Sequence, residues 1–241
     1  RRVAAMAKNL ITEFNHGRLK DETVLENNIV YFRRGYEEMS LNITNRCPNA
    51  CPFCIRDHSI GWGVSNLYLG DEPSPESIVL AAEDALERVL AVSNALPRNV
   101  KICGYGEPIL RLVELPLIVS GVNRKYGPLN WQLTTTGWPL FLLPENGGSA
   151  MKDLYVSGLR HIYLSLHATD KQGYSKMLRP MALKESAFDM ACEFALLCRS
   201  IGYDVTLAFI NVKRRASQEY VDNIVQLARK LGCGYHIRKY E

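Results

Sequence analysis

Three cysteines fall within the eight residues of CPNACPFC (47–54), at the spacing C-x3-C-x2-C. Cysteine thiolates at short spacing are soft ligands that suit zinc or an iron–sulfur cluster. Structural zinc needs a fourth protein ligand, for which His58 is the candidate, and usually takes two separated pairs of ligands. A four-iron cluster held by three thiolates leaves one iron open to another ligand. Three thiols in one short loop therefore favour the cluster over zinc.

The segment GYGEP (104–108) contains a second set of residues suited to binding. Glycines let a main chain approach a ligand closely, and the Glu107 carboxylate can accept a charge-assisted hydrogen bond from an ammonium group. Taken alone, this segment is more typical of a tight turn with a surface glutamate. Together with the cysteine loop, it indicates a binding site for the amino group of an amino-acid ligand.

The elements that must position these residues alternate between strand and helix from residue 39 onward. The predicted strands span residues 39–44, 99–106, 130–137, 160–168, 204–212 and 234–239. The predicted helices span residues 74–94, a short stretch near Pro116, 149–157, 184–202 and 217–232. Such alternation predicts parallel strands joined by right-handed crossovers. We therefore expect an α/β fold in which residues 39–241 form a partial (β/α)6 barrel. Residues 1–38 form a short N-terminal extension with a small strand near 27–32.

In this layout the unusual motifs all follow strand ends. CPNACPFC follows the first strand, GYGEP the second, TTTG (134–137) the third and SLHA (165–168) the fourth, while Asn211 ends the fifth. Ligands of such folds bind at the carboxyl ends of the parallel strands. The motifs are therefore expected to meet on one rim.

The cysteine triplet after the first strand of a six-unit α/β barrel resembles the radical S-adenosylmethionine (SAM) superfamily. The resemblance implies a [4Fe–4S] cluster held by Cys47, Cys51 and Cys54, with SAM bound to the open iron. It also implies an enzyme that cleaves SAM reductively to a 5′-deoxyadenosyl radical, which abstracts hydrogen from a substrate. Phe53, before the last cysteine, matches an aromatic position near the SAM adenine; simple packing of the loop explains it equally well.

The other motifs extend the resemblance around the rim. GYGEP is similar to the family's GGEP motif, with Tyr105 in place of the second glycine, and SLHA is similar to a segment of the branch that methylates ribosomal RNA adenine. Thr136 or its neighbour Thr135 supplies the contact from the third strand, and Asn211 is a weaker ribose candidate. No catalytic acid, base or radical quencher is assigned. The implied SAM-binding residues are Phe53, Gly104, Tyr105, Gly106, Glu107, Pro108, Thr136, Ser165, His167 and Asn211.

Within the superfamily, LNITNRC (41–47), CIR (54–56) and CGYGEPILR (103–111) look like the TatD-linked radical SAM proteins. That resemblance supplies no substrate. RNA or a small molecule is favoured over a peptide because the sequence lacks a second cysteine-rich cluster segment. The expected partner is a one-electron reductant such as flavodoxin or ferredoxin.

The composition is that of a globular protein, with 47% hydrophobic and 22% charged residues. A net charge of +4 is too weakly basic to indicate a nucleic-acid partner, and no apolar stretch is long enough to span a membrane. Seven cysteines make a poor disulfide framework and predict a reducing compartment, the cytoplasm. The four cysteines outside the loop are expected to be small buried hydrophobic residues: Cys103, Cys192, Cys198 and Cys233.

Two alternatives belong to other classes of protein. One is an electron-transfer module that carries a cluster without SAM chemistry, against which GYGEP (104–108) argues because an electron carrier needs no amino-acid seat. The other is a zinc-bound structural or RNA-binding protein, which predicts a fourth ligand such as His58 and a colourless protein.

Overall fold

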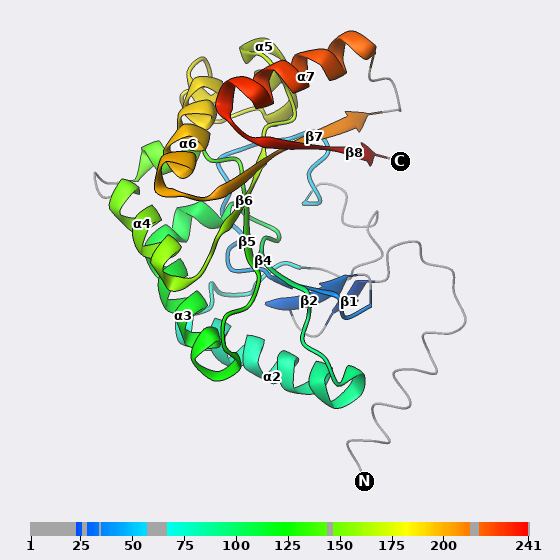
Figure 1. The fold of residues 1–241 in the computed structure, drawn as a ribbon, viewed down its shortest axis with the longest axis vertical. Helices are drawn as coiled ribbons and strands as arrows, with labels where there is room; N and C mark the ends of the chain where they lie inside the picture. The colour runs from blue at the N-terminus through cyan, green and yellow to red at the C-terminus, as the bar shows by residue number, and fades with distance from the viewer. Residues whose placement is uncertain are drawn as a thin grey trace.

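The computed structural model describes residues 23–25, 28–33, 35–56, 67–143, 147–212 and 217–240. These residues form a mixed α/β fold around one eight-stranded sheet with strand order β1 to β8 (Figure 1). The strands are β1 (Thr23–Leu25), β2 (Val30–Arg33), β3 (Glu38–Leu41), β4 (Asn99–Ile102), β5 (Trp131–Thr135), β6 (His161–Ser165), β7 (Asp204–Val212) and β8 (Gly234–Tyr240). Each neighbouring pair from β3 to β8 is parallel. The six predicted parallel strands are confirmed, and the sheet is not closed.

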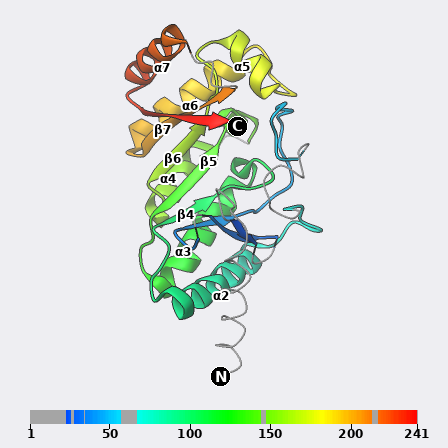
Figure 2. The same cartoon turned by 90° about the vertical axis from the view of Figure 1, so that its right-hand side faces the viewer.

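The helices between the strands lie along one side of the sheet, as the two perpendicular views show (Figures 1 and 2). They are α2 (Pro75–Ser93), α3 (Leu115–Tyr126), α4 (Gly147–Ser157), α5 (Lys171–Leu178), α6 (Ala187–Ile201) and α7 (Gln218–Leu231). Two 3-10 helices follow the β4 and β5 ends, at Pro108–Glu114 and Trp138–Leu142. All of the predicted helices are present, but α5 was not predicted. Its sequence, KQGYSKML, holds a glycine and offers little apolar periodicity, and its first turn is capped by the Asp170 side chain.

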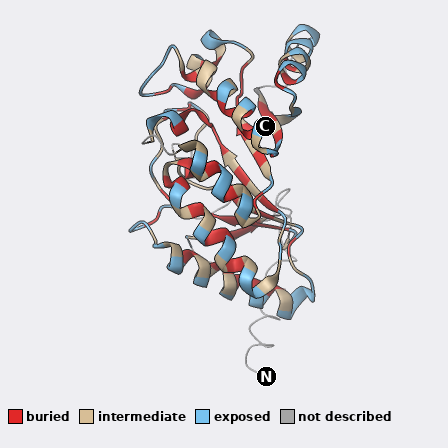
Figure 3. Cartoon of the chain, turned by 60° about the vertical axis from the view of Figure 1, so that its left-hand side comes forward, coloured by how far each residue is buried: buried red, intermediate tan, exposed pale blue. Residues whose placement is uncertain are grey.

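Helix α2 shows how sequence sets these elements. The Ser74 hydroxyl accepts a hydrogen bond from the Ser77 backbone N–H at 3.2 Å, and Pro75 occupies the first turn, where its missing N–H costs nothing. The apolar stripe faces the sheet while the outer face is exposed, an alternation visible along the helices in Figure 3. The buried members of the stripe are Ile78, Ala82, Ala85, Leu86 and Val89.

The two faces of the sheet differ in chemistry. On β6, Ile162 and Leu164 are fully buried and point to the helix side, where Leu164 and Phe194 of α6 both flank Gly137. Because side chains alternate along a strand, Tyr163 points to the opposite face. That face carries polar and aromatic groups, unlike the apolar layers that fill a closed eight-stranded barrel.

The N-terminal extension contributes two strands to the same sheet. Strand β2 pairs antiparallel with β3 and with β1, which confirms the small strand predicted near residues 27–32. The boundary between an extension at 1–38 and a core at 39–241 stays a prediction. None of the helices in the described part of the chain is long and apolar enough to cross a membrane.

Candidate functional site

The cysteine loop follows β3 and is fastened to the segment after α5. The Ala50 backbone N–H donates to the carbonyl oxygens of Leu178 and Arg179, at 3.2 and 3.1 Å. The Met181 N–H donates to the Pro48 carbonyl oxygen at 2.9 Å. The loop is thus held by a part of the chain some 130 positions away, through a helix that the sequence did not reveal.

Burial and nearby negative charge disfavour the thiolate form of two of the three loop cysteines. Burial, helped by the Glu107 carboxylate, raises the pKa of Cys47 to about 11. Burial also raises the pKa of Cys51 to about 12, with further contributions from negative charge on Cys47 and Cys54. Three thiolates are therefore unfavourable together without a cation. Bound iron would supply that positive charge and displace the thiol protons.

Two N–H donors point at the loop's sulfur atoms. The Asn49 amide Nδ2 lies 3.8 Å from Cys47 Sγ, and the Arg56 Nε donates to Cys54 Sγ at 3.1 Å. The Asn49 side chain is itself fixed, because its Oδ1 accepts a hydrogen bond from Trp138 Nε1 at 3.0 Å. Sequence reasoning missed the roles of Asn49 and Arg56. The signal for Asn49 was its place between two cysteines, and it is 1% exposed.

The two glycines of GYGEP are required by the neighbouring chain. A Cβ on Gly104 would overlap the side chain of Asn42, and a Cβ on Gly106 would overlap the carbonyl oxygens of Thr44 and Arg46. Asn42 fixes the turn further, since its Oδ1 accepts the Tyr105 N–H at 2.8 Å. The sequence argument attributed these glycines to close approach of a ligand. The structure gives packing against the segment after β3 as the reason.

We expect Gly106→Ala to destabilise the protein by several kcal/mol, because backbone oxygens on two sides cannot move away from the added methyl group. Overpacking of a buried site typically costs about 1–3 kcal/mol and more where backbone must shift. Gly148→Ala is the matched control, since nothing lies within 4 Å of the position its Cβ would take. Urea unfolding of both variants measures the difference, and an equal stability for the two would contradict the packing argument.

The Glu107 carboxylate joins the ends of β4 and β5. It is 3% exposed, and burial raises its pKa. Its Oε1 accepts from Thr135 Oγ1 at 2.6 Å and from the Ile109 N–H at 3.2 Å. Its Oε2 accepts from the Thr136 N–H at 2.8 Å and from Thr136 Oγ1 at 2.7 Å. Both threonines proposed for the third strand therefore contact Glu107, and Thr136 Oγ1 also accepts from the Asn49 amide at 3.2 Å.

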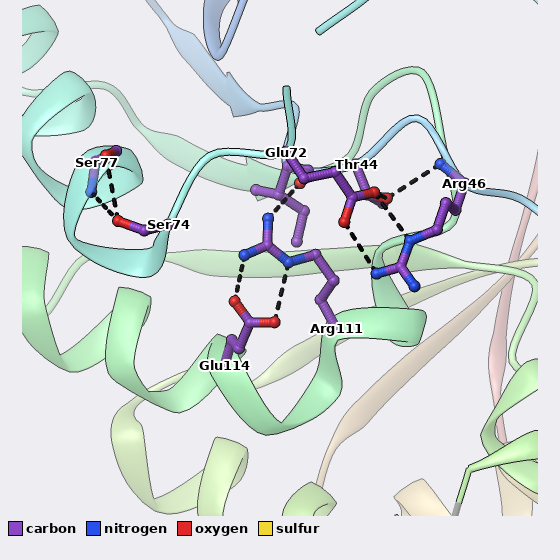
Figure 4. Close-up of polar contacts among 8 residues, drawn as sticks. Thr44, Arg46, Glu72, Ser74, Ser77, Arg111 and Glu114 are labelled. Atoms are coloured by element: carbon purple, nitrogen blue, oxygen red, sulfur yellow. Dashed lines mark hydrogen bonds and ion pairs between the residues drawn. The ribbon is translucent and has the colours of Figure 1, made fainter. Parts of the chain in front are cut away.

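Two arginines near this rim have structural partners (Figure 4). Arg46, beside the first cysteine, makes two hydrogen bonds of 3.0 Å to the Glu72 carboxylate, which the Thr44 hydroxyl also contacts. Arg111 is buried and pairs with Glu114. The Arg46–Glu72 contact ties the segment after β3 to the segment before α2, and Arg111 Nη1 ties it to the 3-10 helix Pro108–Glu114 by donating to the Ile43 carbonyl oxygen at 2.5 Å. The guanidinium groups are thereby engaged by protein carboxylates.

His167 and Phe53 lie side by side on the rim. Their rings lie 5.3 Å apart at 90°, and the His167 backbone has φ of 57°, a conformation rare for residues other than glycine and often found at functional positions. Among the described residues its buried Nδ1 finds no hydrogen-bond partner. Burial, assisted by the positive charge of Arg238, lowers the pKa of His167 to about 3. A neutral imidazole with an unused polar atom thus lies beside Phe53.

Ser165 and Asn211 complete the predicted SAM-binding set. Ser165 ends β6 and is partly exposed on the face opposite the helices. Asn211 lies near the carboxyl end of β7, and its side chain is outside the described part of the structure. His58 also lies outside the described residues. In the described ranges, no three His, Cys, Asp or Glu side chains are grouped so as to hold a single metal ion.

His167→Asn is expected to make the folded protein less sensitive to acid. When the pKa of a histidine is lower in the folded protein than in the unfolded chain, only the unfolded chain takes up the proton as the pH falls. The free energy of unfolding of the protein therefore decreases. Between pH 7.5 and 5.5 this linkage lowers the free energy of unfolding of the wild type by about 1.4 kcal/mol. Asparagine tolerates positive φ and does not titrate there. Urea unfolding at the two pH values checks this, and equal pH dependence of both proteins would refute the buried neutral state.

Comparison with known protein families shows which family this chain belongs to. The family model of the radical SAM superfamily matches residues 41–233, from the end of β3 to the start of β8. The chain belongs to the radical SAM superfamily. This is a superfamily of enzymes that use a [4Fe–4S] cluster and SAM.

Relatives of this radical SAM chain include a probable GTP 3′,8-cyclase of Saccharolobus islandicus, 30% identical over 202 residues. The match covers 83% of this chain and 56% of that protein. A GTP 3′,8-cyclase of Staphylococcus saprophyticus is 26% identical over 194 residues, covering 80% of this chain and 51% of the relative. This chain therefore spans about half the length of the curated relatives it matches.

Solved structures share the fold of this radical SAM chain. SuiB of Streptococcus suis bound to SAM gives a TM-score of 0.61 at 14% identity, covering 87% of this chain and 42% of that one. Methylornithine synthase gives a TM-score of 0.57 at 14% identity, covering 100% of this chain and 59% of that one. The fold class predicted from the sequence, an α/β fold with a partial (β/α)6 barrel of parallel strands that does not close, is thereby confirmed.

The residues of the loop fit the cluster that the family uses. Three thiols are available on one short segment, and N–H groups of Asn49 and Arg56 point at two of them. Such donors commonly surround cluster thiolates and tune them. By their donor chemistry, Cys47, Cys51 and Cys54 of this radical SAM chain fit such a cluster.

The sheet face opposite the helices presents polar groups below the rim. The rings of Tyr163 and His236 lie 6.0 Å apart across β7. Lys101 forms an ion pair with Glu38, and both side chains are largely buried. None of these four positions was singled out from the sequence. In the sequence, these positions alternate with buried aliphatic residues along the strands, and this alternation could have indicated that they share one face of the sheet.

The four remaining cysteines do not share one environment. Cys198 is buried, as predicted, but Cys103, Cys192 and Cys233 are only partly buried. Cys103 faces the polar side of the sheet, where its Sγ lies 3.3 Å from the Tyr31 hydroxyl of β2. The expectation of a buried residue is therefore confirmed for Cys198 alone, whereas Cys192 and Cys233 are partly buried and pack against the core. Partial burial still raises the pKa of Cys192 and Cys233 to about 11, so neither is an activated thiolate.

Proposed function

We propose that Cys47, Cys51 and Cys54 hold a [4Fe–4S] cluster whose open iron binds SAM. When bound, the cluster, once reduced, would give one electron to the SAM sulfonium; the C5′–S bond would break to release methionine and a 5′-deoxyadenosyl radical able to abstract hydrogen from a substrate. One observation carries the proposal: the cysteine loop and the Glu107 anchor adjoin on one rim, because Thr136 Oγ1 donates to Glu107 Oε2 at 2.7 Å and accepts from the amide of Asn49, which lies between Cys47 and Cys51, at 3.2 Å. An electron carrier would need the thiols but not this adjoining rim.

The remaining rim residues take supporting roles. The turn at 104–108 offers main-chain groups to the methionyl amino group, and Glu107 fixes that turn to β5. Thr136 acts through Glu107 and Asn49, as a positioning residue. Phe53 and His167 address the adenosyl part of SAM. Ser165 and Asn211 are proposed for the ribose or carboxylate on the sequence argument alone.

The decisive experiment is anaerobic reconstitution with iron and sulfide, followed by dithionite and SAM. About four irons per chain and release of 5′-deoxyadenosine are expected. Zinc in place of iron would refute the proposal and favour the structural or RNA-binding alternative. Iron without SAM binding would favour the electron-transfer module. SAM binding is measured separately by the change it causes in the cluster's electron paramagnetic resonance (EPR) spectrum.

The substrate we propose is a small polar molecule, with purine nucleotides as the first compounds to test. Curated relatives are GTP 3′,8-cyclases, and the polar groups opposite the helices, including Tyr163, His236, Lys101 and Glu38, suit such a ligand. GTP should increase 5′-deoxyadenosine formation at least tenfold. A short RNA, the other class expected from the sequence, and a peptide serve as comparisons. Stimulation by RNA alone would contradict the nucleotide proposal. The reductant, flavodoxin or ferredoxin, remains a prediction.

A further inference from the structure

Arg56 closes the cysteine loop on itself. Its Nε donates to Cys54 Sγ at 3.1 Å, while its Nη2 donates to the Asn49 carbonyl oxygen at 2.5 Å. One side chain thus joins the end of the loop to the peptide between its first two cysteines. The planar fork of donors in arginine suits this double contact, which a lysine ammonium cannot reproduce.

The other end of this contact is rigid. The Asn49 side chain is held by Trp138 Nε1 at 3.0 Å, and its Nδ2 donates to Thr136 Oγ1 at 3.2 Å. Asn49 also forms an isolated antiparallel bridge with Pro180. Arg56 is therefore fixed relative to the rim, and its charge is held at one place beside the sulfur atoms.

The Arg56 guanidinium lies on the loop that carries all three thiols. It donates to Cys54 Sγ, and its second hydrogen bond, to the Asn49 carbonyl oxygen, holds its charge beside the segment between Cys47 and Cys51. The guanidinium is permanently charged, so it offers a fixed positive charge and an N–H donor to a thiolate. Both features favour the state in which the sulfur ligands carry more negative charge.

We propose that Arg56 is a positioning residue that raises the reduction potential of the cluster held by this loop. The inference rests on the proposed function, because it needs the cluster. One electron from the external reductant converts the oxidised cluster, [4Fe–4S]2+, to the reduced form, [4Fe–4S]1+, and no bond or proton changes at Arg56. The added negative charge is stabilised by the guanidinium. Without it, a smaller fraction of the cluster is reduced at any given potential.

Arg46 provides a matched comparison on the same loop. It directly precedes Cys47, so its replacement removes the same charge at a similar place in the sequence. However, its guanidinium is bound by the Glu72 carboxylate and is largely exposed. Screening by solvent and by this partner should leave the cluster nearly insensitive to Arg46. The contrast separates the contact of Arg56 from net charge alone.

The test uses reconstituted wild type, Arg56→Lys, Arg56→Gln, Arg56→Met and Arg46→Gln without SAM. Iron per chain and cluster absorption are measured first, and the reduced cluster is then quantified by EPR at a series of fixed potentials. Where the wild-type cluster is half reduced, the reduced-to-oxidised ratio should fall about tenfold in Arg56→Met and less in Arg56→Lys. Arg46→Gln should match the wild type.

The outcomes separate this inference from the function on which it rests. An unchanged midpoint in Arg56→Gln and Arg56→Met with full iron content would overturn the redox role. Loss of iron without a midpoint shift in the clusters that remain would show that Arg56 only closes the loop, which also overturns it. If Arg56→Met cannot retain a cluster, the lysine and glutamine variants decide the question. Absence of an iron–sulfur cluster from the wild type would instead be a failure of the proposed function.

Discussion

Cys51→Ala is expected to lower bound iron from about four per chain to a small fraction of that value, and to abolish 5′-deoxyadenosine formation. Cys51 is the most buried of the three loop cysteines, and its Sγ donates to the Leu178 carbonyl oxygen at 3.4 Å. No other side chain on the loop supplies sulfur at that position. The measurement is iron and sulfide content after anaerobic reconstitution, with 5′-deoxyadenosine quantified by chromatography.

Cys192→Ala is the matched control, because it removes the same thiol from a partly buried position on α6. It should retain iron and SAM cleavage. Thermal unfolding of both apo-variants shows whether either substitution disturbs the fold. If Cys51→Ala kept its iron–sulfur absorption and its activity, Cys51 would not be a ligand, and the assignment of the loop would have to be revised.

The architecture was predictable because it depends on local patterns. Capping residues such as Ser74 and Ser217 mark helix starts, and glycines at 202 and 232 mark helix ends in left-handed conformations. The parallel order then follows from helical crossovers. Helix α5 escaped prediction because eight residues, one of them Gly173, give too short a period to recognise.

The metal-binding loop was also visible in the sequence, whereas its supports were not. The supporting contacts are not local in sequence or follow no regular spacing. Asn49 and Asn42 bind partners up to 89 positions away, and Arg56 binds another residue of its own loop. No periodicity encodes such contacts. The sequence indicated that Glu107 matters, but it could not show that the carboxylate faces the threonines after β5. The same polar chemistry serves a ligand or a neighbouring strand, and only the tertiary structure distinguishes the two.

Glu107→Gln is expected to reduce the free energy of unfolding by about 2–4 kcal/mol and to weaken SAM binding. The four groups that donate to the carboxylate come from Ile109, Thr135 and Thr136. A glutamine amide turns one oxygen acceptor into an NH2 donor, so at least one buried N–H or hydroxyl loses its partner. The turn at 104–108 is then less firmly held to β5. Urea unfolding and SAM titration of the reconstituted protein measure the two effects.

A double-mutant cycle with Thr135→Val tests whether Glu107 acts as an anchor. If the carboxylate stabilises the rim through this 2.6 Å contact, the two substitutions are non-additive, because the second removes a partner that the first has already lost. Glu87→Gln, at an exposed ion pair with Lys125, should cost much less. If Glu107→Gln had normal stability but no longer bound SAM, the proposal that Glu107 anchors the turn at 104–108 to β5 would be wrong. It would return Glu107 to the role expected from the sequence, a direct acceptor for the SAM ammonium, with its threonine contacts replaced when the ligand arrives.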